Sequence, residues 1–313
     1  LQRYVYLAMM AVDDSYTSKT KEAGQRVRSH LQDGGLTNVS YHYQGSVMTD
    51  THIKGYSDID LLVICEKYYS YDSSSVKQIL ASYDTRYSYS QLSKLKSIDN
   101  ASPYTGNVYD DLRAIRVQSE SILSCKYLKC DVSHPKAIKI TNQDLHRDVD
   151  IVTAGWYDNV TSIINDQNIT YRGIQVYDKV ANNRCAADYP FLSIERINTK
   201  SVNTGGRLKR MIRFLKNIKA DSKQKIDLSS FDINAICYNI DVDAYKDLHY
   251  LNLVTIVFLQ LHKIAYDEPY ANSITSVDGK EYIFRGNNKR REVSTMLQNV
   301  YTIYSILKEQ HLI

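Results

Sequence analysis

Two kinds of apolar spacing divide the chain near residue 190. Before that point, short runs typical of strands predominate, among them DIDLLVI at 58–64 and the segments AIKI and DVDIV within 125–152. A further strand-like run is expected at 108–119, and an amphipathic helix at 15–31. Strands interspersed with helices predict an α+β lobe built around a sheet.

Beyond residue 190 the apolar residues follow a helical period. The segment 205–220 carries one apolar stripe, formed by Leu208, Met211, Ile212, Leu215 and Ile218. Three further helices are predicted at 229–240, 247–264 and 292–310. We therefore expect two lobes: residues 1–190, a sheet lobe with the N-terminal helix packing across it, and residues 191–313, a helical lobe.

Composition narrows the class of protein. The 313 residues are 43% hydrophobic and 24% charged, which is ordinary for a folded globular chain and argues against disorder. A net charge of +4 does not by itself indicate a nucleic-acid binder. No run approaches the roughly 18 apolar residues of a membrane span, and no signal peptide is evident, so we expect a cytoplasmic protein without membrane contact. The five scattered cysteines favour free thiols, with a zinc site at Cys125, Cys130, His134 and His146 as the alternative.

The candidate chemistry begins with a Gly-Ser turn and two acids. Gly45 and Ser46 precede Asp58 and Asp60, and an apolar strand follows the acids. Alternate residues of a strand point to the same face, so the two carboxylates project together and favour Mg²⁺ or Mn²⁺. A Gly-Ser turn offers backbone N–H groups and a hydroxyl to phosphate oxygens. Taken alone, each feature is typical of an ordinary turn or a solvated strand end.

A second acidic strand supplies a third carboxylate. The segment RDVDIV contains Asp148 and Asp150, which share one face of a strand. Either acid can lie beside the first pair, or both can serve as edge charges that prevent aggregation. Three acids on neighbouring strands are typical of a two-metal site for phosphoryl transfer.

Four blocks in this order resemble a known family. GSVMTDTHIKGYSDIDLLVI, at 45–64, is similar to the signature of DNA-polymerase-β-type nucleotidyltransferases, and its Thr51, Ile53 and Ser57 resemble the bacterial CD-NTases, the cGAS/DncV-like cyclic oligonucleotide synthases of CBASS anti-phage systems. RDVDIVTAGWYDN resembles their third-acid strand, and LKRMIRFLKNIKAD and LSSFDINAICYNI resemble helices of their OAS/cGAS-like helical lobe. Two departures, Gln44 before the Gly-Ser turn and Thr153 after the third-acid strand, remove no metal ligand.

The resemblance implies a role for particular residues. The metal-binding and catalytic acids would be Asp58, Asp60 and Asp150, holding two Mg²⁺ or Mn²⁺ ions, with Asp148 as the competing assignment. The donor triphosphate would be bound by Gly45, Ser46, Lys209, Lys216 and Ser230. Lys209, Arg213 and Lys216 are expected on one helix face opposite the apolar stripe, with a solvated helix face as the alternative reading. Ser229 is expected to cap the helix that follows it.

The resemblance also implies the reaction. We expect a two-lobed, metal-dependent and template-independent nucleotidyltransferase with its active site in the cleft, making a cyclic di- or trinucleotide from ATP, GTP or a pyrimidine NTP. The product would act on a downstream CBASS effector, and the enzyme would be a monomer without an obligatory nucleic-acid activator. The alternatives are a linear nucleotidyltransferase that modifies RNA, protein or a small molecule, and a non-catalytic nucleotide sensor of the same fold.

Overall fold

The chain forms two compact units, which are described one at a time. The computed structural model describes residues 1–56, 58–82 and 85–313. The sheet unit contains Thr17–Gly45 and Asp58–Leu192, and the helical unit contains Leu1–Tyr16, Ser46–Ser57 and Ser193–Ile313. The segments 1–16 and 46–57 thus cluster with the helices, although both lie within the predicted lobe 1–190. The division into a sheet lobe at 1–190 and a helical lobe at 191–313 stays a prediction.

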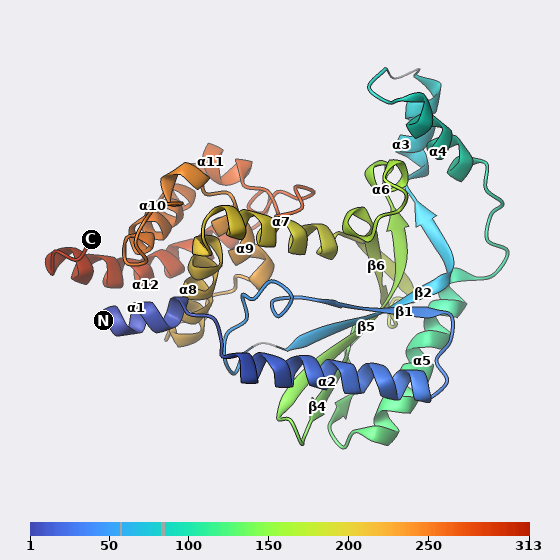
Figure 1. Ribbon diagram of the computed structural model, residues 1–313, viewed down its shortest axis with the longest axis horizontal. Helices are drawn as coiled ribbons and strands as arrows, with labels where there is room; N and C mark the ends of the chain where they lie inside the picture. The colour runs from blue at the N-terminus through green and yellow to red at the C-terminus, as the bar shows by residue number, and fades with distance from the viewer. Residues whose placement is uncertain (57, 83–84) are drawn as a thin grey trace. The chain divides into compact units, whose positions relative to one another are not determined.

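One mixed sheet organises the sheet unit (Figure 1). The described residues contribute seven strands: β1 (Val39–Gln44), β2 (Ile59–Tyr71), β3 (Cys130–Asp131), β4 (Ile138–Asn142), β5 (Arg147–Asp158), β6 (Gly173–Asp178) and β7 (Asn183–Asp188). Their order is β1-β2-β5-β4-β3, and β6 extends the sheet from β5 to β7. Strands β2 and β5 pair in parallel, whereas the other pairs are antiparallel. The strands predicted at 58–64 and in the DVDIV segment are confirmed.

The central strands are buried because their sequence is apolar on both faces. In β2 the run from Leu61 to Cys65 is completely buried. Such continuous burial is typical of parallel strands covered on both sides. Because side chains alternate, Asp60 lies on the same face as Leu62 and Ile64, which pack against β5 and Ile174. Asp60 therefore stands at one end of an apolar face.

Helices cover this sheet. Helix α2 (Asp14–Asp33) confirms the helix predicted at 15–31, and its Gly24 lets the helix approach closely, because a Cβ there would come within 2.9 Å of Tyr43 and 3.2 Å of Ile59. Helix α5 (Val108–Lys126) packs against β2 and β5. The strand predicted at 108–119 is wrong: Leu112, Ile115 and Ser119 recur at helical spacing and form the buried side of α5.

Three helices form a smaller cluster within the sheet unit. They are α3 (Ser73–Ala81), α4 (Tyr89–Asp99) and α6 (Val160–Ile164). The cluster packs around Val76, Leu95 and Ile163, and α3 and α4 project beyond the end of β2 (Figure 1). A short 3₁₀ turn, η1 (Ile169–Tyr171), connects α6 to β6.

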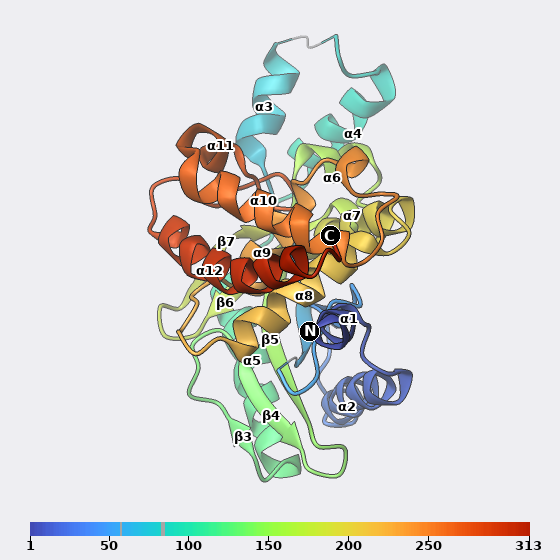
Figure 2. The same cartoon turned by 90° about the vertical axis from the view of Figure 1, so that its left-hand side faces the viewer.

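The helical unit is built around the predicted apolar stripe. It contains α1 (Gln2–Met9), most of α7 (Pro190–Asn203), α8 (Arg207–Asp221), α9 (Ser230–Tyr238), η2 (Val242–Ala244), α10 (Asn252–Tyr266), α11 (Glu268–Ser273) and α12 (Lys289–Glu309). All five stripe residues of α8 are buried, and α8 packs against α1, α9, α10 and α12. Helices α10 and α12 lie side by side (Figure 2). The predicted helices at 205–220, 229–240, 247–264 and 292–310 are confirmed.

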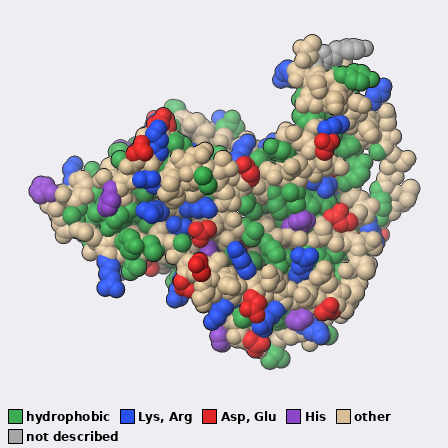
Figure 3. Space-filling model, viewed as in Figure 1, with side chains coloured by type: hydrophobic (Ala, Val, Ile, Leu, Met, Phe, Trp, Pro, Cys, Tyr) green, Lys and Arg blue, Asp and Glu red, His purple; other side chains and the backbone are tan. Residues whose placement is uncertain are grey.

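The surface and the cysteines add little to the choice of function. On the face drawn in Figure 3, acidic and basic side chains are interspersed rather than gathered into one patch of a single sign. None of the described helices combines the length and the apolar character needed to cross a membrane. All five cysteines are free thiols. The prediction of an α+β protein with a sheet and a helical C-terminal part is confirmed, and the sheet is mixed.

Candidate active site

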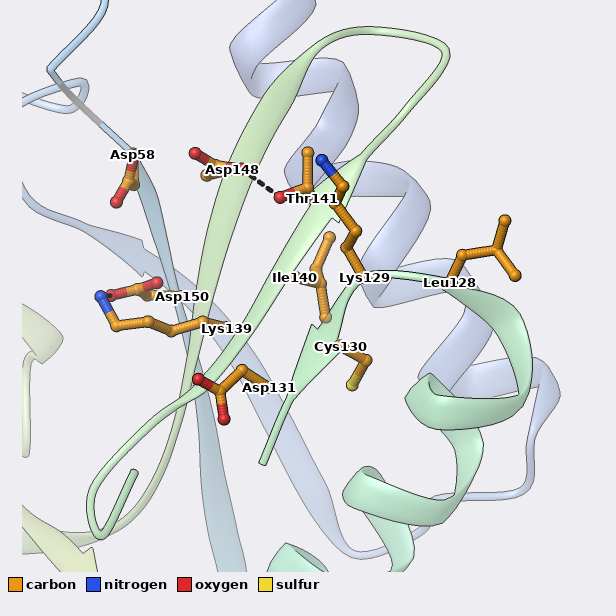
Figure 4. A pocket seen from close by; sticks show the side chains of 10 residues that line it. All are labelled: Asp58, Leu128, Lys129, Cys130, Asp131, Lys139, Ile140, Thr141, Asp148 and Asp150. Atoms are coloured by element: carbon orange, nitrogen blue, oxygen red, sulfur yellow. Dashed lines mark hydrogen bonds and ion pairs between the residues drawn. The ribbon is translucent and has the colours of Figure 1, made fainter. Parts of the chain in front are cut away.

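Three charged side chains form a row across neighbouring strands of the sheet unit. Asp60 on β2 lies directly opposite Asp150 on β5, and Lys139 on β4 lies opposite Asp150 on its other side. Side chains of directly opposed residues share one face of a sheet. The Lys139 ammonium group contacts the Asp150 carboxylate, with Nζ 3.1 Å from Oδ2 (Figure 4). Asp58, just before β2, completes the group.

Burial and mutual repulsion raise the pKa of two of these acids. Burial, followed by the charges of Asp150 and Asp58, raises the pKa of Asp60 to about 7. Burial, followed by the charge of Asp150, also raises the pKa of Asp58. The positive charge of Lys139 opposes both shifts. Carboxylates that repel one another in a partly buried position are stabilised by a cation.

The Gly-Ser turn meets the acids through Gly45. This residue has a positive φ of 85°, a conformation that L side chains rarely adopt. A Cβ at Gly45 would also collide with Oδ2 of Asp60. Glycine is therefore required here for two reasons: the backbone turns sharply after β1, and the carboxylate lies directly against its Cα.

The two candidates for the third acid differ in their surroundings. Asp150 faces Asp60 in the strand register, and its charge acts on both Asp58 and Asp60. Asp148 lies opposite Thr141, whose hydroxyl donates a hydrogen bond of 2.6 Å to the Asp148 carboxylate. Both acids line a cavity of about 470 Å³, lined by Asp58, Leu128, Lys129, Cys130, Asp131, Lys139, Ile140, Thr141, Asp148 and Asp150 (Figure 4).

The donor set of this cavity fits a hard divalent cation. Carboxylate oxygens are the ligands that Mg²⁺ prefers, and the acids lie on adjacent strands where one ion can contact more than one of them. In the described part of the chain, however, no three His, Cys, Asp or Glu side chains converge closely enough to hold a metal ion as they stand. One oxygen of Asp150 is instead engaged by Lys139. The acids therefore have the donor atoms of a metal site, but their side chains do not converge on one point.

Two of the predicted phosphate-binding residues meet in the helical unit. Lys216 of α8 and Ser230, the first residue of α9, line a cavity of about 350 Å³ together with Ile53, Tyr56, Lys219, Ala220 and Ile233. Lys216 is only 6% exposed, and its ammonium group donates to the carbonyl oxygen of Thr51 at 3.0 Å and to the Thr51 hydroxyl at 3.3 Å. Burial lowers the pKa of Lys216 to about 8. A buried ammonium group beside an open cavity is well placed for an anionic ligand.

The remaining predicted residues have different surroundings. Lys209 does not line the cavity that contains Lys216, although burial lowers its pKa as well. Ser46 begins a turn in which its carbonyl oxygen accepts hydrogen bonds from the Thr51 N–H and the Thr49 hydroxyl. Ser229 caps α9 through a hydrogen bond from the Asp232 N–H, as predicted. Ser57, part of the family resemblance, lies outside the described residues.

The alternative reading of Lys209, Arg213 and Lys216 as a solvated face of α8 is wrong for two of the three residues, and their shared role at the triphosphate stays a prediction. Arg213 and Lys216 are each only 6% exposed. The Arg213 guanidinium group donates to the carbonyl oxygen of Met9 at 2.9 Å and pairs with Asp50 at 3.4 Å. The segments 1–16 and 46–57 pack over this side of the helix and bury it, which a single helical period cannot reveal.

Comparison with known proteins places the chain in a family. Residues 195–305 match the cGAS/DncV-like nucleotidyltransferase C-terminal helical domain. A c-di-GMP synthase of Capnocytophaga granulosa is 51% identical over 308 residues, covering 98% of this chain and 87% of that protein. The chain belongs to the bacterial CD-NTase family. A second CD-NTase, a c-di-GMP synthase of a Lachnospiraceae bacterium, is 47% identical over 309 residues, covering 97% of this chain and 88% of its own length.

The CD-NTase fold is shared as well. The solved structure of a STING-associated CdnE c-di-GMP synthase from Flavobacteriaceae sp. has a TM-score of 0.89 at 39% identity, covering 98% of this chain and 87% of that one. The chain is therefore an enzyme, a nucleotidyltransferase of the cyclic dinucleotide-synthesising group, and nucleotides are its substrates. CD-NTases generally use divalent metal ions, which agrees with the carboxylate donors of the sheet unit.

The sequence does not predict one residue of the site. Lys139 contacts Asp150, whereas the pattern of AIKI predicts only a strand. The alternation of apolar and polar residues in this strand places Lys139 on the face opposite the buried Ile138 and Ile140. This alternation is the one feature of the sequence that points to Lys139. Pairing it with Asp150 requires the register between β4 and β5, and the sequence does not contain that register.

Proposed function

We propose that this protein joins two molecules of GTP into c-di-GMP without a template. The proposed product rests on sequence identities of 51% and 47%, over nearly the whole chain, to proteins named c-di-GMP synthase. The observation that supports the chemistry is the group of Asp58, Asp60 and Asp150 on adjacent strands. The enzyme acts as a monomer on the cytoplasmic nucleotide pool and needs no nucleic-acid activator.

The three acids are the proposed ligands of two Mg²⁺ or Mn²⁺ ions. Asp150 is preferred to Asp148 because it opposes Asp60 directly, whereas Asp148 is engaged by Thr141. Divalent ions held there supply positive charge that favours loss of the ribose hydroxyl proton and stabilises charge on the phosphates. Gly45 keeps the backbone close to the Asp60 carboxylate.

The phosphate-binding residues orient the donor nucleotide. Lys216 and Ser230 share one cavity, where an ammonium group and a hydroxyl provide donors for triphosphate oxygens. Gly45 and Ser46 offer backbone N–H groups, and Lys209 adds positive charge. Orientation of this kind contributes much of the rate of phosphoryl transfer, because the attacking oxygen must align with the leaving group.

The reaction proceeds in two equivalent transfers. A ribose hydroxyl oxygen of one GTP forms a bond to the α-phosphorus of the other, the bond to the β-phosphate oxygen breaks, and pyrophosphate leaves. The hydroxyl proton is released to solvent. A second transfer within the linear intermediate closes the ring, so two GTP give one c-di-GMP and two pyrophosphates. The proposed receiver is a CBASS effector that binds c-di-GMP, in line with the STING-associated description of the Flavobacteriaceae relative.

Product analysis tests this function. The protein is incubated with all four NTPs and Mg²⁺ or Mn²⁺, treated with phosphatase and analysed by mass spectrometry. We expect a phosphatase-resistant product with the mass of c-di-GMP, which D60A lacks and D144N retains, since the Asp144 side chain is 85% exposed outside the acid group. A resistant product of another mass would refute the assignment of GTP. Products that phosphatase degrades completely would indicate a linear nucleotidyltransferase, and unchanged turnover by D60A would refute the catalytic assignment.

A further inference from the structure

A lysine occupies the position where a cation would bind the acid group. The Lys139 ammonium nitrogen lies 3.1 Å from Oδ2 of Asp150 (Figure 4). The strand register continues this row to Asp60 on β2. The Asp150 side chain is 18% exposed, so this contact is partly shielded from water. The negative charges of Asp150, Asp58 and Asp60 all act on Lys139. The ammonium group thus balances part of the charge of the whole cluster.

The strand register fixes the backbone of Lys139 opposite Asp150 but does not fix the Lys139 ammonium group. The backbone of Lys139 is fixed in β4 opposite Asp150, but its side chain is 45% exposed. A lysine has a long flexible stem and a point charge, so its ammonium group can leave the carboxylate without any movement of the strand. The Asp150 carboxylate, in contrast, stands on a short side chain that is only 18% exposed. Of the two partners, the lysine is therefore the one that can move.

We propose that Lys139 is the counter-ion of the acid cluster in the metal-free protein, and that a divalent ion must displace its ammonium group from Asp150 in order to bind. The proposal rests on the assignment of Asp58, Asp60 and Asp150 as metal ligands in the proposed function. It makes Lys139 a positioning residue that sets the metal affinity of the enzyme.

Displacement follows from the size of the groups and their charges. Mg²⁺ binds carboxylate oxygens at about 2.1 Å, and an ammonium group that keeps its present contact with Asp150 would repel an ion on the same carboxylate strongly. The free energy needed to release Lys139 is subtracted from that of metal binding, so the ion binds weakly in the absence of nucleotide. A nucleotide triphosphate brings additional oxygen ligands, which favours entry of the ion together with its substrate.

The test measures Mn²⁺ binding to the 313-residue chain without nucleotide, by isothermal titration calorimetry and by the loss of the electron paramagnetic resonance signal of free Mn²⁺. Four proteins are compared after removal of metal: wild type, K139M, K139R and K129M. We expect K139M to bind Mn²⁺ about tenfold or more tightly than wild type, because one neighbouring charge changes the cation affinity of a carboxylate by at least this factor. K139R keeps the charge and should bind like wild type. K129M removes a lysine that lines the same cavity and should also bind like wild type.

Two further results separate this proposal from the proposed function. If wild type binds Mn²⁺ and D60N abolishes that binding, the acids are metal ligands, and an affinity of K139M equal to or weaker than that of wild type overturns only the role of Lys139. If neither wild type nor K139M shows binding that depends on Asp60, the metal site and the counter-ion are both refuted. Thermal unfolding in the presence of a chelator verifies that each variant is folded. An equal gain in Mn²⁺ affinity for K129M and K139M would mean that only the net charge of the cavity matters, and this result would overturn the proposal.

Discussion

The buried ammonium group of Lys216 makes the stability of the protein depend on pH in a definite direction. Lys216 is 6% exposed, and its burial lowers the pKa from the ordinary value near 10.5 to about 8. Between these two values the unfolded chain binds a proton at Lys216 that the folded chain does not. The free energy of unfolding therefore rises with pH across this window, and below pH 8 the cost of burying the charge is fully present.

The size of the effect follows from the same pair of values. Each pH unit between about 8 and 10.5 corresponds to about 1.4 kcal/mol, so burial of the charged Lys216 costs about 3 kcal/mol at neutral pH. The variant K216M carries no such cost, although it loses the hydrogen bonds to Thr51. We expect the stability of K216M relative to wild type to fall by about 3 kcal/mol as the pH rises from 7.5 to 10.5.

Urea unfolding at pH 7.5, 9 and 10.5 measures this difference. Groups that titrate equally in wild type and K216M cancel when the two are subtracted, which isolates Lys216. K223M provides the control, because Lys223 is an exposed lysine and its removal leaves the burial of Lys216 unchanged. If the difference between K216M and wild type stays constant within about 0.5 kcal/mol over the whole range, the ammonium group is not desolvated as described and the reasoning fails.

The same lysine should couple pH to nucleotide binding. A triphosphate near Lys216 favours the charged form, so binding above pH 8 requires the uptake of a proton. We expect the advantage of wild type over K216M in GTP affinity to shrink as the pH rises from 7 to 9.5. Equilibrium binding at several pH values checks this expectation, and an advantage that does not change with pH would remove Lys216 from the triphosphate site.

Three further substitutions test separate parts of the structure. G45A forces an L side chain into a φ of 85° and against the Asp60 carboxylate, so we expect a loss of about 1–2 kcal/mol of stability and more than a tenfold loss of rate, measured by urea unfolding and initial rates. D150N should abolish product, whereas D148N should retain at least about a tenth of the rate; the reverse order would assign Asp148 as the third acid. R116M should cost about 1–3 kcal/mol in urea unfolding, because the buried guanidinium group donates to the carbonyl oxygens of His134 and Ala137, which lose this donor; no measurable cost would contradict this.

The sequence predicts helices and strands well where the apolar residues follow a single clear spacing. The apolar stripe of α8 from Leu208 to Ile218 lies in a helix with the expected buried side. The segment 108–119 does not meet this condition, because Arg116 and Ser119 stand on the buried side of α5 and interrupt the apolar face that would mark a helix. Local pattern decides the element only when the surroundings do not bury its polar positions.

The candidate site is predictable in residue type but not in arrangement. Asp58 and Asp60 share a face by alternation alone, and this part follows directly from the sequence. The opposition of Asp60 and Asp150 depends on the parallel register between strands 90 residues apart, and the contact of Lys139 depends on a second register. Likewise, burial of Lys216 arises from the segment 46–57, which packs onto α8 through Thr51. Such contacts between distant segments are set by the whole fold.

The division of the helical unit into three stretches of sequence constrains how the chain can be made. Met9 and Val5 of α1 belong to the same apolar core as residues of α8 and α12. During synthesis residues 1–16 therefore leave the ribosome long before the helices that bury them, and their apolar side chains remain exposed while the sheet unit is translated. A fragment that ends at residue 192 would retain that exposed segment permanently. Removal of residues 1–16 should consequently reduce the aggregation of this fragment, which still retains the segment 46–57 of the helical unit.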